Sequence, residues 1–120
     1  MHSKIVSIED GKGPAKFPEV FGVKERDDFY KEISFSGWGG SSGHDAPMIA
    51  YDALLGCNES FEELCLRGVL HGGDSDSTGI MCCAWYGAMY AYNGVPEALY
   101  SKLDFKDELI RLGQQLLLRD

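Results

Sequence analysis

The chain has 120 residues, of which 44% are hydrophobic, and this length suits one compact domain. Lys and Arg total 11 against 19 Asp and Glu, so the formal net charge is −8. Such a chain would repel a phosphate backbone, which argues against a nucleic-acid partner.

The N-terminal part of the chain predicts an irregular segment followed by one helix. Residues 1–23 contain breakers that interrupt every candidate period, namely Gly11, Gly13, Pro14, Pro18 and Gly22. Residues 24–33 are charged, with Phe29, Tyr30 and Ile33 at helical spacing, and predict a short amphipathic helix. A Gly/Ser loop follows at residues 36–43.

Capping signals predict the next two helices. Asp45 is expected to cap a helix that has Pro47 in its first turn and ends at Gly56. One face of that helix is expected to contain Met48, Tyr51, Asp52 and Leu55. Ser60 and Glu63 form a capping box for the following helix, which Gly72 and Gly73 end. Its apolar side is expected to contain Phe61, Leu64, Cys65 and Leu70.

The last part of the chain predicts a central helix and an amphipathic one. Residues 77–92 are apolar on every side, as in a helix that is packed all round, and Asn93 and Gly94 end it. Pro96 opens a short helical turn, and Asp104 is expected to cap a final helix. Its inward-facing residues would be Phe105, Leu109, Leu112 and Leu116. No run alternates long enough for a strand, so we predict an all-α domain of about five helices over residues 24–120.

The cysteines and the hydrophobic runs indicate a cytoplasmic location. The four cysteines show no C-x-x-C spacing, and Cys82 and Cys83 lie in an apolar run, so buried reduced thiols are expected. The longest uncharged run, residues 77–95, is interrupted by Tyr, Asn and Gly, and the N-terminus lacks the basic-then-apolar pattern of a signal peptide. We therefore expect neither a membrane partner nor export.

The most informative motif is His-Gly-Gly-Asp-Ser-Asp-Ser-Thr at residues 71–78. Asp74, Asp76 and Ser77 offer oxygen ligands only, the set that Mg²⁺ or Ca²⁺ prefers, and the flanking glycines let the backbone bend. The alternative is an ordinary helix N-terminus, where acids and hydroxyls cap the backbone and complement the dipole. His71 is expected to bond the carbonyls that end the preceding helix, rather than a metal.

Two known motifs with similar spacing do not fit this segment. As an EF-hand loop starting at Asp74, the twelfth position would be Trp85, where a bidentate carboxylate is required. The Asp-x-Asp-x-Thr of haloacid-dehalogenase-like phosphatases needs its first Asp at the end of a buried strand. Gly72 and Gly73 stand there instead, and no β/α alternation follows.

A second motif is the glycine-rich loop at residues 35–45, which leads into a helix N-terminus. Such a loop can present several backbone N–H groups to an anion. No Lys or Arg occurs between Lys31 and Arg67, so a phosphate here would be held by amides, hydroxyls and a metal. The alternative is a flexible surface loop. Phe35 and Trp38 argue against it, because these side chains could stack on a purine or close a pocket.

Together the two motifs resemble the ADP-ribosylglycohydrolase family, in particular its ADP-ribosylarginine hydrolase branch. The resemblance implies an orthogonal bundle of helices that holds two Mg²⁺ ions and hydrolyses the N-glycosidic bond between ADP-ribose and arginine. It implies catalytic roles for Asp74 and Asp76, with Asp74, Asp76 and Ser77 as metal ligands and Asp76 as the bridging one. It also implies an ADP-ribose pocket lined by Phe35, Ser36, Gly40, Ser41, Ser42 and His44. No acid/base pair of the usual glycosidase type is assigned.

The sequence departs from the family pattern in one respect. Family members carry a Glu and a Thr/Ser-Asp-Asp cluster in an N-terminal part, and no such cluster occurs before Phe35. We therefore expect a C-terminal fragment of one domain that is inactive alone. The alternative is a non-catalytic protein that binds ADP-ribose or another partner. Exposed apolar surface is expected to favour self-association.

Overall fold

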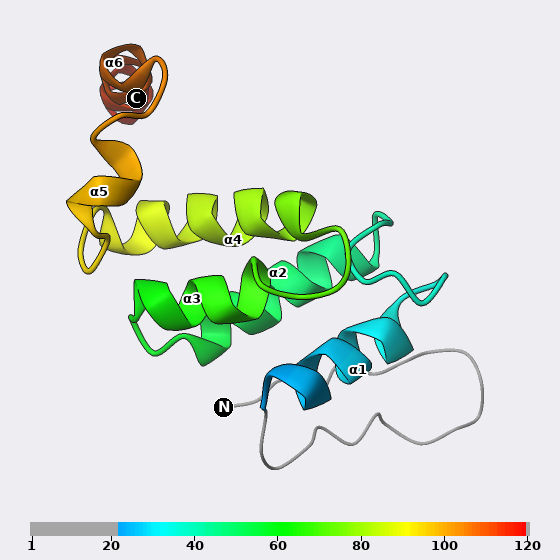
Figure 1. Cartoon of the computed structure of the whole chain (residues 1–120). Helices are drawn as coiled ribbons and strands as arrows, with labels where there is room; N and C mark the ends of the chain where they lie inside the picture. Colours follow the sequence, from blue (N-terminus) through cyan, green and yellow to red (C-terminus); the bar gives the residue numbers. More distant parts are fainter. Residues whose placement is uncertain (1–21, 120) are drawn as a thin grey trace.

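The computed structural model describes residues 22–119, and within them the chain is all-helical, as predicted (Figure 1). The predicted irregular segment lies outside the described residues except for Gly22 and Val23, and Val23 already begins a helix. The described part contains six helices, one of which is a single turn: α1 (Val23–Ile33), α2 (Asp45–Gly56), α3 (Phe61–Gly68), α4 (Ser75–Tyr90), α5 (Glu97–Tyr100) and α6 (Lys106–Leu117). None of the helices described is long and apolar enough to cross a membrane.

Helices α2, α3 and α4 pack against one another and form the main core (Figure 1). The buried residues of this core are Ala50, Ala53, Cys57, Leu64, Cys82 and Tyr86. The bounds of α2 agree with the prediction, but its predicted face is wrong by about one residue. Ile49 and Ala50 are fully buried, whereas Tyr51 is 49% exposed. Because α2 is apolar at almost every position, its period does not identify the buried side, and the small alanines are the residues that allow close helix packing.

Helix α3 begins as predicted and ends earlier. Ser60 is its N-cap and accepts a hydrogen bond from the Glu63 N–H at 3.2 Å. The carboxylate of Glu63 does not close the capping box, because it accepts a hydrogen bond from Arg67 Nε at 2.7 Å. The helix ends at Gly68 instead of Gly72, since residues 69–73 turn the chain toward α4.

Helix α4 runs from Ser75 to Tyr90 and is not packed all round, which corrects the prediction. Only one side is buried against α2 and α3, and it contains Thr78, Gly79, Cys82 and Tyr86. The opposite side is open: Ile80 is 72% exposed and Met89 is 60% exposed. The described helices therefore cover one face of α4 only.

Helices α5 and α6 extend from the C-terminal end of α4, away from the core (Figure 1). Neither contains a buried residue, so the expectation that the apolar side of α6 faces inward is wrong for the described chain. Its N-cap is Phe105, in a left-handed conformation with φ of 59°, and Asp104 does not cap it. Leu109 and Leu116 are more than half exposed. The prediction of self-association rests on such side chains.

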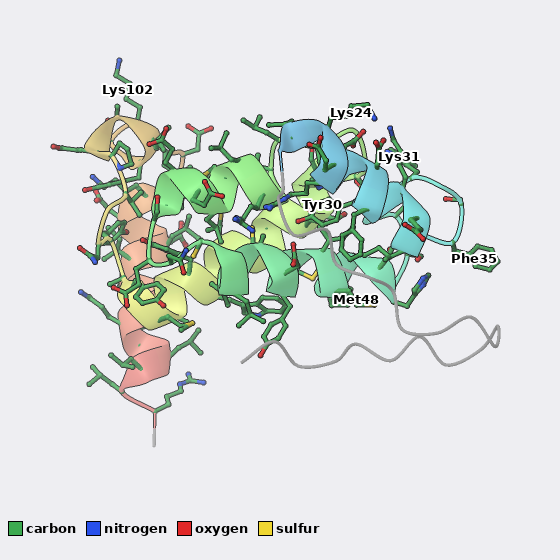
Figure 2. The ribbon with its side chains drawn as sticks, turned by 90° about the horizontal axis from the view of Figure 1, so that it is seen from below. Lys24, Tyr30, Lys31, Phe35, Met48 and Lys102 are labelled. Carbon is green, nitrogen blue, oxygen red and sulfur yellow. The ribbon has the colours of Figure 1, made fainter. Side chains whose placement is uncertain are left out.

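Helix α1 packs through Phe29 and Tyr30 against Ile49 of α2. The Tyr30 hydroxyl donates to Asp52 Oδ2 at 2.9 Å, and Figure 2 shows Tyr30 between the two helices. Asp27 Oδ1 accepts a hydrogen bond from the Gly72 N–H at 2.8 Å. Helix α1 thus fixes the segment that leads into α4.

Candidate functional site

The glycine loop and the N-terminus of α4 lie directly against each other. The Asp74 N–H donates to the Gly39 carbonyl at 2.9 Å. A Cβ on Gly73 would lie 2.1 Å from that carbonyl oxygen, and a Cβ on Gly40 would lie 2.7 Å from Thr78 Cγ2. Glycine at these positions lets two backbones approach, so the structure brings the two predicted motifs together in one place.

Asp74, Asp76 and Ser77 form a hydrogen-bonded set at the start of α4. Asp74 is the N-cap, and its Oδ2 accepts a hydrogen bond from Ser77 Oγ at 3.1 Å. The hydrogen bond with Asp76 raises the pKa of Asp74, and the same bond lowers the pKa of Asp76. Two neighbouring carboxylates repel each other, and a proton or a cation bound between them relieves this repulsion.

The donor set of these three residues fits a hard divalent cation. It consists of two carboxylates and one hydroxyl, all oxygen, which suits Mg²⁺. Within residues 22–119, no three His, Cys, Asp or Glu side chains gather where they could hold a metal ion together. The described chain thus offers few protein ligands, and water would complete an octahedral shell around Mg²⁺.

The predicted pocket residues fall into two groups. Gly40 is buried against α4, and Ser42 is half-buried, with Oγ 2.9 Å from His44 Nδ1. Ser36 and Ser41 are exposed, and their hydroxyls lie 3.4 Å apart. Phe35 is 90% exposed and points away from the helices in Figure 2. Gly40 therefore lies against α4 and Ser42 at the start of α2, whereas Phe35 lies apart from the helices.

The structure adds Asp45, which the sequence suggested only as a helix cap. Asp45 is the first residue of α2 and is fully buried, and His44 occupies the N-cap position, so the prediction that Asp45 caps the helix is wrong. Its Oδ1 accepts hydrogen bonds from Ser42 N and Ser42 Oγ, both at 2.9 Å. Burial opposes ionisation, but the hydrogen bonds from Ser42 outweigh it and lower the pKa of Asp45. An Asp at a helix start looks the same in sequence whether it only caps or also faces a site.

His71 connects the motif to the buried side of α4. Its Nε2 lies 2.8 Å from Thr78 Oγ1, and its Nδ1 accepts a hydrogen bond from the Gly73 N–H at 3.1 Å. Thr78 Oγ1 donates to the Gly68 carbonyl at 2.7 Å, so the Thr78 hydroxyl accepts from a protonated Nε2. Burial lowers the pKa of His71, which keeps this tautomer neutral. His71 thus has a structural role, although its partners are Thr78 and Gly73 instead of helix-end carbonyls.

Comparison with known proteins gave consistent matches. The sequence model of the ADP-ribosylglycohydrolase family matches residues 6–120. ADP-ribosylhydrolase ARH1 of Dictyostelium discoideum is 54% identical over 101 residues, which is 83% of this chain and 26% of that protein. The putative ADP-ribosyl glycohydrolase L444 of Acanthamoeba polyphaga mimivirus is 33% identical over 76 residues, 61% of this chain and 15% of that protein. The aligned part of the chain thus spans about a quarter of the first relative and less of the second.

Proposed function

Since the chain belongs to the ADP-ribosylglycohydrolase family, we propose that it supplies one side of a Mg²⁺-dependent site that hydrolyses the bond between ADP-ribose and arginine. The observation that carries this proposal is the hydrogen bond between the Asp74 N–H and the Gly39 carbonyl, at 2.9 Å. It joins the acidic motif to the glycine loop. A cation and a nucleotide sugar bound to these two segments would therefore be neighbours.

In this proposal Asp74, Asp76 and Ser77 hold the cation. When bound, a divalent cation supplies positive charge that orients sugar hydroxyls and polarises water for attack at the anomeric carbon. At the start of α4 Asp76 is exposed and Asp74 is half-buried, so a ligand can reach both carboxylates. The interaction with Asp76 raises the pKa of Asp74, and this supports a cation there, because a positive charge would relieve the repulsion between the two carboxylates.

The loop holds the ADP-ribose through neutral groups. Ser36, Ser41 and Ser42 offer hydroxyls, and Gly37 and Gly40, both with positive φ, let the backbone turn its amides outward. No Lys or Arg lies in the sequence between residues 31 and 67, so the diphosphate depends on these groups and on the cation. The four free cysteines support a reducing compartment, and we place the protein in the cytoplasm.

A second candidate function is binding of ADP-ribose without catalysis. The observation that favours it is that no three His, Cys, Asp or Glu side chains of residues 22–119 gather into a group that could hold a metal ion. A Mg²⁺ ion held by two carboxylates and one hydroxyl keeps most of its water and binds weakly. By this argument the chain alone binds ADP-ribose and does not turn over substrate.

One assay separates the two functions. Release of ADP-ribose from ADP-ribosylated arginine is measured with Mg²⁺, first with the chain alone and then with an added N-terminal portion of a family member. The proposal expects release only in the mixture, and loss of release with Asp76→Asn but not with Asp104→Asn, which removes an exposed carboxylate near α6. Calorimetry with ADP-ribose measures binding by the chain itself. Absence of both binding and release would refute the proposal.

A further inference from the structure

Asp45 has one carboxylate oxygen that the described protein does not satisfy. The side chain is fully buried, and Oδ2 has no hydrogen-bond partner among the described residues. Oδ1, in contrast, accepts two hydrogen bonds from Ser42. Buried polar atoms are nearly always paired, and an unpaired oxygen of an ionised group is especially unfavourable. Oδ2 thus needs a hydrogen-bond donor, and the described part of the chain does not supply one.

No Lys or Arg lies close to Asp45 in sequence, although His44 is adjacent to it. Lys31 and Arg67 are the nearest Lys and Arg along the chain. The glycine loop connects Asp45 and Asp74, because Ser42 bonds to Asp45 and a Cβ on Gly40 would lie 3.1 Å from the Asp74 carbonyl oxygen. Asp45, Asp74 and Asp76 together therefore favour a bound cation.

We propose that Asp45 is an outer-sphere ligand of the divalent cation at Asp74 and Asp76, with Oδ2 accepting a hydrogen bond from a water molecule on that cation. The inference rests on the proposed metal site. It assigns Asp45 no direct bond to the metal, because Asp45 does not form a three-residue metal-binding group with Asp74 and Asp76. Outer partners of this kind orient the inner shell and strengthen binding.

Asp45→Asn tests the inference with little change of shape. Asparagine keeps an oxygen that can accept from Ser42 and replaces the unpaired oxygen by an NH₂ group, which repels a donor. Mn²⁺ serves as the probe, and its free concentration is read by electron paramagnetic resonance with wild type, Asp45→Asn, Asp76→Asn and Asp104→Asn. We expect Asp45→Asn to weaken Mn²⁺ binding by about tenfold, the usual effect of losing such a partner. Asp104→Asn removes the same charge elsewhere and should leave binding unchanged.

The outcomes distinguish the inference from the proposed function. If Asp76→Asn weakens Mn²⁺ binding and Asp45→Asn does not, the inference is wrong and the metal site remains. If wild type does not bind Mn²⁺, both are wrong. A tenfold effect that disappears in high salt would indicate only the distant charge of Asp45, because screening removes long-range attraction and leaves a local hydrogen bond.

A measurement on the wild-type chain covers the case in which Asp45→Asn fails to fold. Cobalt(III) hexaammine resembles a hydrated Mg²⁺ ion but exchanges no ligand, so it binds only through hydrogen bonds. We expect it to shift the amide NMR signals of Gly40, Ser42 and Asp45. Unchanged signals at these three residues would overturn the inference.

Discussion

The contact between Gly40 and α4 can be tested by adding one methyl group. In Gly40→Ala the new Cβ would lie 2.7 Å from Thr78 Cγ2 and 3.1 Å from the Asp74 carbonyl oxygen. Alanine would also have to adopt a φ of 90°, which costs about 1 to 3 kcal/mol. The steric overlap adds about 1 to 3 kcal/mol, as in other overpacked sites. The free energy of unfolding should therefore fall by about 2 to 6 kcal/mol.

Two other loop glycines separate these contributions. Gly37 has a φ of 78° and nothing within 4 Å of an added Cβ, so Gly37→Ala measures backbone strain without overlap. An added Cβ on Gly43 would have nothing within 4 Å either, and its φ is not in the left-handed region, so Gly43→Ala should have almost no effect. Urea unfolding followed by circular dichroism gives the three values. Equal losses for Gly40→Ala and Gly37→Ala would refute the close packing of the loop on α4.

Three further changes test the supports of the site. Ser60→Ala removes the cap of α3 and should lower the free energy of unfolding by about 1 kcal/mol in urea, whereas Ser60→Thr should retain most of it. Thr78→Val leaves the Gly68 carbonyl and His71 Nε2 without their buried partner, so a loss of about 1 to 3 kcal/mol is expected in the same assay. The pKa of Asp27 is lowered, first by its hydrogen bond with Lys31 and then by the one from the Gly72 N–H. Its carboxylate therefore stabilises the fold fully above the unfolded pKa of about 3.9. This stabilisation is lost as the pH falls through the folded pKa. The stability difference between wild type and Asp27→Asn should accordingly be constant above about pH 5 and shrink as the pH falls below the unfolded pKa of about 3.9, and a difference that stays constant there would contradict this linkage.

The sequence predicted the bounds of α2 and the start of α3 correctly, but it did not predict the end of α3 or the cap of α6. Asp45 and Gly56 bound α2 as predicted, and Ser60 caps α3, because these signals act within a few residues. Which face of a helix is buried depends on its neighbours. Helix α2 offers apolar side chains on several faces, and α6 has a regular apolar stripe that no described helix covers. Periodicity identifies such a stripe but not its partner.

The two motifs of the candidate site were also visible in the sequence, but their arrangement was not. The resemblance grouped Gly40 and Ser42 with Asp74, and the structure places the loop and the acidic motif together through the bond from Asp74 N to Gly39 O. The unpaired oxygen of Asp45 could not be foreseen. It depends on how the loop folds back over the start of α2, which is a property of the tertiary structure.

The hydrogen bond from the Asp74 N–H to the Gly39 carbonyl joins the two ends of a chain segment that contains all of α2 and α3. The glycine loop and the start of α4 therefore come together only when α2 and α3 have formed and packed. Until then, the entropy cost of closing this loop opposes the contact. Unwinding either helix separates the two sides at once. In native-state hydrogen exchange the Asp74 amide should become deuterated only together with the interior amides of α2 and α3, as one cooperative unit.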